Sequence, residues 1–246
     1  MNTDTDAMVH PSARLGIILS SGNRTLEPYF RAFAPAGLGI HVTRMRMGSG
    51  GQRPRGDIAA TAIAAAELVG DTGIDAVLLQ GTGIMMERGP AGEAELVAEL
   101  AKAAKAPAYT ATQSVVESLK ALGAARIAVV NPGNDGAVER ERAYLDAVGI
   151  TVAGAAALDL GDATFDLTPE QWTAAASAAD GAGVEAIFLS GSHTRALEAI
   201  AATEAATGKP VVTSIQAALW AGLERLRDRL AAAPANPALG RLFARA

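Results

Sequence analysis

The sequence contains an internal repeat that spans most of its length. The segment Gly73–Thr82 (GIDAVLLQGT) matches Gly183–Ser192 (GVEAIFLSGS) without a gap, 110 residues further along. Three looser pairs occur in the same order and at a similar offset: Arg14–Ile18 with Arg126–Val130, Gly39–Val42 with Gly149–Val152, and Pro107–Gln113 with Pro210–Gln216. Because chance matches between common strand and helix patterns would not keep this order, the repeat predicts two similar halves.

Each half has the pattern of a parallel α/β fold. Short runs rich in Val and Ile alternate with longer alanine-rich segments of helical period, as in sheets covered by helices on both faces. We therefore expect an α/β fold of two pseudo-symmetric domains, each a four-stranded parallel sheet flanked by helices. The first half should comprise residues 1–112 and 215–246, the second 113–214, with a ligand cleft between them. The expected strands are 14–19, 39–46, 75–80, 107–111, 126–131, 151–156, 185–190 and 210–214.

Composition excludes several classes of protein. With a net charge of −5 and scattered basic residues, we expect no nucleic-acid partner. No apolar run reaches the ~18 residues that cross a bilayer, and the polar, acidic N-terminal segment is unlike a secretion signal, so we expect a cytoplasmic protein without a membrane partner. The three histidines lack metal-site spacing, which predicts no metal, and we expect no cofactor.

Two further features of the composition bear on chemistry. The glycine-rich segment 48–51 lacks the order of a phosphate-binding motif, and we interpret it as a loop that could act as a lid with Arg53 and Arg55. The chain has no cysteine, which excludes disulfides, thiolate–metal sites and thiol nucleophiles.

Polar, glycine-rich segments follow four of the expected strands. In open parallel sheets, ligands bind beyond the carboxyl ends of the strands, where helix starts present free N–H groups. If the halves face each other, four segments should converge on the cleft: 20–25 (SSGNRT), 80–83 (QGTG), 131–136 (NPGNDG) and 190–194 (SGSHT). Hydroxyl, amide and N–H groups suit a small carboxylate. Alternatively, each such residue only caps a helix or forms a turn.

The opening segment carries a family resemblance. Gly16–Phe30 (GIILSSGNRTLEPYF) is similar to the first segment of the maleate cis–trans isomerase and arylmalonate decarboxylase branch of the aspartate/glutamate racemase superfamily. The segments His41–Arg46 and Gly208–Trp220 also resemble that branch, so the similarity covers most of the chain. It implies the two-domain fold, a homodimer or higher homo-oligomer, and a group of residues that hold the substrate carboxylate: Ser21, Asn23, Thr82, Gly83 and Ser192.

The resemblance also shows what this chain lacks. Members of the branch place a cysteine after each repeat strand, as a nucleophile or as a proton donor and acceptor. Here Gly81 and Gly191 stand at those two places, and Gly133 stands where the branch usually carries a tyrosine. Arylmalonate decarboxylases also have glycine at the first place, but they keep the second cysteine. The carboxylate-binding part of the site is thus retained without its thiols.

The missing thiols restrict the chemistry. Racemisation needs a proton acceptor and a donor on opposite faces, and cis–trans isomerisation needs a nucleophile, whereas decarboxylation to an enediolate needs mainly oxyanion donors and one proton donor. His193 is the candidate acid or base, unless it is a surface or helix-capping histidine. We therefore predict a thiol-independent enzyme acting on a small carboxylate, a decarboxylase or lyase ahead of an isomerase. The alternative is a catalytically silent carboxylate-binding protein.

Overall fold

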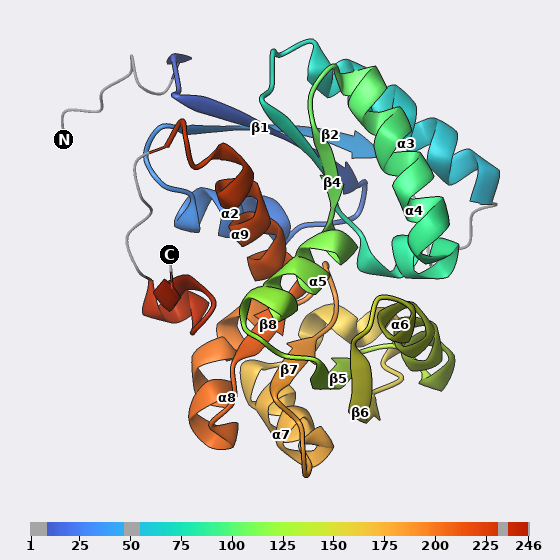
Figure 1. Cartoon of the computed structure of the whole chain (residues 1–246), viewed down its shortest axis with the longest axis vertical. Helices are drawn as coiled ribbons and strands as arrows, with labels where there is room; N and C mark the ends of the chain where they lie inside the picture. The colour runs from blue at the N-terminus through green and yellow to red at the C-terminus, as the bar shows by residue number, and fades with distance from the viewer. Residues whose placement is uncertain (1–8, 47–54, 231–235, 246) are drawn as a thin grey trace.

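The protein contains two parallel four-stranded sheets with the same strand order (Figure 1). The computed structural model describes residues 9–46, 55–230 and 236–245. The order β2-β1-β3-β4 in the first sheet is repeated as β6-β5-β7-β8 in the second, which confirms the expected fold class. The strands are β1 (Ala13–Ser20), β2 (Leu38–Met45), β3 (Ala76–Leu79), β4 (Ala108–Thr110), β5 (Arg126–Asn131), β6 (Thr151–Ala157), β7 (Ala186–Leu189) and β8 (Val211–Thr213).

Helices connect the strands and cover the sheets. Every residue of β3 and β7 is buried, as expected for central strands that are apolar on both faces. The α-helices are α2 (Leu26–Phe33), α3 (Arg55–Gly70), α4 (Thr82–Ala104), α5 (Ala111–Ala121), α6 (Asp135–Ala147), α7 (Pro169–Ala179), α8 (Ile200–Thr207) and α9 (Ser214–Leu226). Short 3-10 helices occupy Gly161–Asp166, Ala196–Ala199, Pro237–Leu239 and Phe243–Arg245.

The repeat extends to the way α5 and α9 begin. Thr110 caps α5, and Thr213 caps α9, and each hydroxyl accepts the backbone N–H three residues later. In both helices the side-chain oxygen of the glutamine at that third position, Gln113 or Gln216, accepts a hydrogen bond from the capping residue's N–H. These reciprocal caps explain why the last strand of each half passes directly into a helix.

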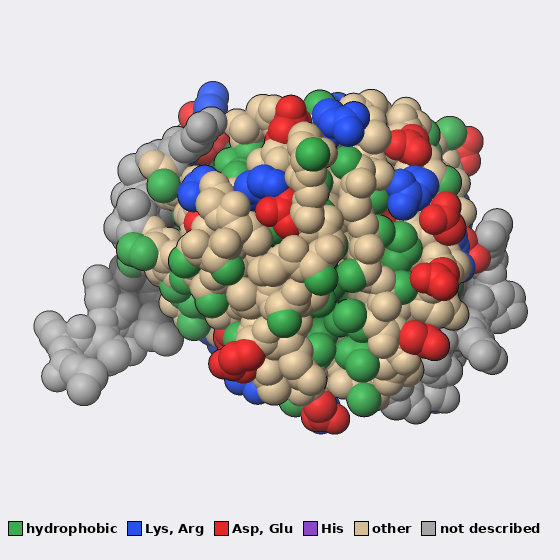
Figure 2. Space-filling model, turned by 90° about the horizontal axis from the view of Figure 1, so that it is seen from below, with side chains coloured by type: hydrophobic (Ala, Val, Ile, Leu, Met, Phe, Trp, Pro, Cys, Tyr) green, Lys and Arg blue, Asp and Glu red, His purple; other side chains and the backbone are tan. Residues whose placement is uncertain are grey.

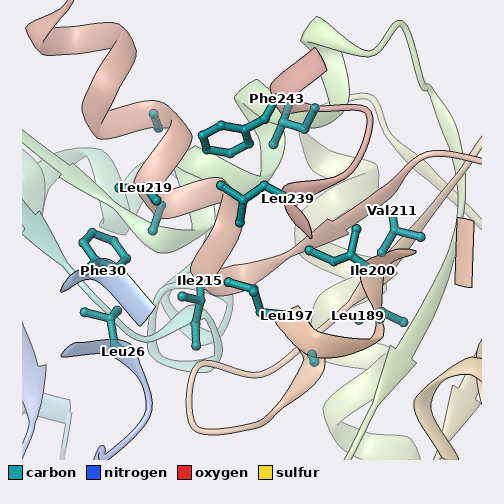
Figure 3. Close-up of a cluster of buried hydrophobic side chains, with 14 of the residues drawn as sticks. Leu26, Phe30, Leu189, Leu197, Ile200, Val211, Ile215, Leu219, Leu239 and Phe243 are labelled. Atoms are coloured by element: carbon teal, nitrogen blue, oxygen red, sulfur yellow. The ribbon is translucent and has the colours of Figure 1, made fainter. Parts of the chain in front are cut away.

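One hydrophobic cluster fixes the two halves relative to each other. It contains residues of both sheets, including Leu15 and Leu78 from the first and Val130 and Leu189 from the second. In Figure 3, Ile215 and Leu219 of α9 lie between Leu26 and Phe30 of α2 on one side and Leu197 and Ile200 of the second half on the other. Helix α9 thus joins the halves by packing against both. The domain boundaries near residues 112 and 215 remain predictions.

The described surface mixes charges of both signs. On the face in Figure 2, acidic and basic side chains are interspersed, and no basic stripe crosses that face. Within the described residues, no helix has the length and apolarity needed to cross a membrane. The proposed lid segment 48–51 and Arg53 lie outside the described residues, and so does the side chain of Arg55.

Candidate functional site

A cavity of about 490 Å³ lies at the carboxyl ends of the strands, and we call it the strand-end cavity. At least one residue from each of the four polar segments lines it. Its polar lining residues come from both halves: Ser20, Gln80, Thr82, Glu87, Asn131, Arg140, Glu141 and Ser192. Gly81, Gly83, Ile58, Ile84, Met86 and Ala137 complete the lining. The arrangement offers hydrogen-bond donors, a guanidinium group and an apolar wall to one small ligand.

Gly81 shapes the first-half wall of the cavity. It precedes α4 with a φ of 139°, a conformation that L side chains rarely adopt, and no side chain caps this helix start. The first-turn N–H groups of α4, which begin at Thr82 and Gly83, therefore do not donate to the side chain of a capping residue. Since Thr82 and Gly83 also line the cavity, this wall is suited to an anionic ligand.

Gly191 has a similar conformation in the second half. Its φ is 133°, and a Cβ atom built on it would lie 2.7 Å from Cγ2 of Thr194. Hydrogen bonds hold this backbone on both sides, because the Gly191 N–H donates to the Ser214 hydroxyl over 3.2 Å and its carbonyl accepts from Thr194 over 3.1 Å. Neither Gly81 nor Gly191 thus has a backbone that readily accepts a side chain such as that of cysteine.

Asn23 holds two parts of the structure together through hydrogen bonds of its side chain. Its side-chain amide donates to the Ser192 carbonyl over 2.6 Å, and its Oδ1 accepts the N–H groups of Thr25 and Leu26, each over 3.1 Å. Asn23 therefore ties the start of α2 to the Ser192 loop of the other half. It is buried, but it is not among the described residues that line the strand-end cavity.

Arg44 holds the loop that contains Ser21 and Asn23. Its guanidinium donates to the carbonyls of Ser21 over 3.2 Å and Asn23 over 2.7 Å, and it pairs with Glu27. Ser21 is exposed, and among the described residues it is not part of the cavity lining.

His193 lies beside the cavity lining and not in it, as far as the described residues show. The centroid of its ring lies 5.8 Å from that of Phe165. The guanidinium of Arg24 stacks on the Phe165 ring, with its central carbon 3.7 Å from the ring centroid. Burial, followed by the charge of Arg24, lowers the pKa of His193, so the imidazole is neutral near pH 7. Its Nε2 is buried and makes no hydrogen bond to the described protein.

The cavity contains a buried carboxyl group that we did not predict. Glu141 is 3% exposed, accepts a hydrogen bond from Ser190, and lies on the buried face of α6 with Val138 and Leu145. Burial raises the pKa of Glu141 to about 7, although the side chains of Asn131 and Ser190 lower it. The sequence could have indicated that Glu141 is buried, because it stands where the helical period of α6 otherwise places apolar residues.

Gln80 is a second polar group that the sequence analysis did not single out as a binding residue. It directly follows β3 and corresponds to Ser190 in the repeat, and only 3% of it is exposed. Both polar atoms of its amide are buried without a hydrogen bond to the described protein, and so is Oε2 of Glu141. An unpaired buried polar atom costs ~1–3 kcal/mol, so three such atoms on one cavity indicate a ligand-binding surface.

Three further observations delimit the site. Gly133 forms a tight turn, since its N–H donates to Oδ1 of Asn131 over 2.7 Å and a Cβ atom there would lie 3.0 Å from that oxygen. Among the described residues, no group of three histidine, aspartate or glutamate side chains is arranged to hold a metal ion. Another hollow, of about 580 Å³, lies between α3 and α4, but none of its lining residues is at a strand's carboxyl end.

Known proteins resemble this chain along nearly its whole length. A family model described as arylmalonate decarboxylase matches residues 30–243. The chain belongs to the arylmalonate decarboxylase family. It is 29% identical to the arylmalonate decarboxylase of Bordetella bronchiseptica, over 98% of this chain and 97% of that one. It is 30% identical to a maleate isomerase of Nocardia farcinica (strain IFM 10152), over 94% and 95%.

Solved structures of related proteins share the fold. The maleate isomerase from Pseudomonas putida S16, determined with maleate, superposes with a TM-score of 0.83 and 26% identity, over 94% of this chain and 97% of its own. A variant of the Nocardia farcinica maleate cis–trans isomerase, determined with a covalently bound succinylcysteine intermediate, gives a TM-score of 0.86 and 26% identity, over 95% and 99%. That enzyme forms its intermediate on a cysteine, a residue that this chain lacks throughout.

Proposed function

We propose that this protein is an enzyme that converts a small carboxylate without a thiol, by decarboxylation or isomerisation through an enediolate-like intermediate. The observation that carries the proposal is the strand-end cavity, where the first turn of α4 meets Ser192 and Arg140. Helix N–H groups, a hydroxyl and a guanidinium together attract a carboxylate. The names of the relatives, arylmalonate decarboxylase and maleate isomerase, support this class of substrate.

Decarboxylation is the reaction that depends least on the two absent cysteines. The α carbon–carboxylate bond breaks, its electron pair moves into the remaining carboxylate, and CO2 leaves. Donors near Thr82 and Gly83 would stabilise the resulting enediolate, while Ile58, Ile84 and Met86 form an apolar wall that is unfavourable to the departing carboxylate. Addition of a nucleophile, as in isomerisation, has no cysteine to use here.

The first test is a thermal-shift screen against small mono- and dicarboxylates, including maleate and arylmalonates. Each stabilising compound is then followed by NMR in D2O for loss of CO2, isomerisation or deuterium uptake. Turnover supports the enzyme. Stabilisation without any chemical change would instead support the catalytically silent carboxylate-binding protein.

A pair of variants tests whether the ligand occupies the strand-end cavity. Arg140 lines the cavity, whereas Arg142, two residues later on α6, donates to the Val152 carbonyl and pairs with Glu139. Arg140→Gln should raise the Kd of a bound carboxylate about tenfold, because a charge-assisted hydrogen bond contributes ~1.5–3 kcal/mol. Arg142→Gln should leave the Kd unchanged. Equal effects of the two variants would place the ligand elsewhere.

A further inference from the structure

The site needs a proton donor, and the described geometry offers one on the second-half wall. Decarboxylation leaves a carbanion-like α carbon that must gain a proton before the product is released. The family position for a donor is Gly191, which has no side chain. Of the two candidate groups, the His193 ring lies against Phe165, whereas Glu141 lines the cavity itself.

We propose that Glu141 is the proton donor of this cysteine-free site and delivers its carboxylic acid proton to the α carbon of the bound substrate. The assignment rests on the proposed function. Glu141 comes from α6 of the second half, while the donors at Thr82 and Gly83 come from α4 of the first, so a ligand between them meets both. The free oxygen of the carboxyl group, Oε2, is the one without a hydrogen-bond partner in the described protein.

The hydrogen bonds around Glu141 orient it for this role. The Ser190 hydroxyl donates to Oε1, and the nearby Asn131 side chain lowers the pKa of the carboxyl group. Asn131 is itself fixed, because its Oδ1 accepts the Gly133 N–H over 2.7 Å. Ser190 directly follows β7 and Asn131 ends β5, so both side chains are held at the ends of the sheet strands.

The proposed step conserves atoms and charge. The enediolate takes the Glu141 proton, a C–H bond forms at the α carbon, and the electron pair of the enediolate's C=C bond becomes that bond. Glu141 becomes a carboxylate, which regains a proton from water before the next turnover. Burial raises the pKa of Glu141 to about 7, so the group is largely protonated below neutral pH and about half protonated at pH 7, as a donor requires. The other charged groups on the cavity are Arg140, also on α6, and Glu87 on α4.

The chain supplies a matched control for Glu141. Glu93 is an equally buried glutamate on α4, and its two oxygens accept hydrogen bonds from Thr110 and Tyr144. Unlike Glu141, it is not among the described residues that line the cavity. Glu93→Gln therefore makes the same isosteric change in a similar environment, outside the reaction site.

The experiment compares kcat and KM of the natural chain, Glu141→Gln, Glu93→Gln and His193→Gln on a substrate found by NMR. We expect Glu141→Gln to lower kcat by roughly 10²- to 10⁴-fold with little change in KM. Glu93→Gln should keep kcat near that of the natural chain, and His193→Gln tests the competing candidate donor. A Glu141→Gln variant that turns over normally, or loss of kcat in His193→Gln alone, would overturn the assignment while leaving the proposed function intact.

A pH profile separates a proton donor from a structural group. The kcat of the natural chain should fall as pH rises through about 7, where Glu141 loses its proton. If Glu141→Gln does not fold, Glu141→Asp decides: a lowered kcat with a shifted basic limb supports the donor, and an unchanged profile overturns it. Binding without turnover in the natural chain would refute the proposed function, and the donor with it.

Discussion

At the scale of single residues, Gly81 and Gly191 differ from ordinary loop glycines. Gly81 and Gly191 both have a φ in the range that L side chains rarely adopt, and each adjoins a wall of the strand-end cavity. The family pattern predicted their positions but not their backbone. A single sequence does not reveal a positive φ, because glycine also occurs where the backbone is ordinary.

Restoring a cysteine at Gly191 should therefore destabilise the protein. Gly191→Cys introduces a Cβ atom 2.7 Å from Cγ2 of Thr194 at a φ of 133°, and we expect the free energy of unfolding to fall by ~1–3 kcal/mol. Urea denaturation measures the change. Gly181→Cys is the control, since nothing lies within 4 Å of its Cβ position and its φ is outside that range. Equal stability of the two variants would contradict the account.

Glu141 should make stability depend on pH. Its pKa is about 7 in the folded protein, against 4.5 for an unperturbed glutamate, so the folded state binds more protons between those values. Stability from this group is present below about pH 4.5 and is lost as pH rises through about 7. As pH rises over that window, the free energy of unfolding of the natural chain should therefore fall by up to ~3 kcal/mol relative to that of Glu141→Gln. A difference independent of pH would show that Glu141 has an ordinary pKa.

The sequence pointed to some site residues and missed others for physical reasons. Thr82, Gly83 and Ser192 follow strands, and the rule that ligands bind at strand ends placed them at the cavity. Glu141 lies inside a helix, seven residues into α6, where strand-end reasoning gives no signal. Only the helical period, which puts it in line with Val138 and Leu145, distinguishes it from an exposed glutamate.

At the scale of elements, the sequence predicted all eight described strands. Most of them are short apolar runs, and polar residues follow several of these runs. The cavity depends on how α4 and α6 pack across the halves, which the pattern within one element does not specify. These helices also meet away from the cavity lining, where Glu93 of α4 accepts hydrogen bonds from Tyr144 of α6 and from Thr110.

The two matching helix caps should therefore contribute unequally to stability. Thr213→Ala removes the cap of α9 and should lower the free energy of unfolding by ~1 kcal/mol. Thr110→Ala removes the equivalent cap of α5 and also leaves an oxygen of the buried Glu93 without its donor, which adds ~1–3 kcal/mol. Denaturant unfolding of both variants checks the order, and an equal or larger loss in Thr213→Ala would contradict it.

At the scale of the whole molecule, the halves should unfold together, because one hydrophobic cluster contains residues of both sheets. The two tryptophans provide local probes: Trp172 lies in α7 of the second half and Trp220 in α9. In Trp172→Phe and in Trp220→Phe, the fluorescence midpoint should coincide with that of circular dichroism. Separate midpoints within either variant would indicate that the halves unfold independently.

The central claim is that a family member without cysteine still performs chemistry on a carboxylate. The most direct measurement is NMR of the natural chain with an arylmalonate in D2O, which follows both CO2 loss and deuterium at the α carbon. We expect a decarboxylated product that carries deuterium at this carbon and that forms much more slowly with Glu141→Gln. An arylmalonate that stabilises the protein in a thermal shift yet stays chemically unchanged, with maleate behaving in the same way, would contradict the account.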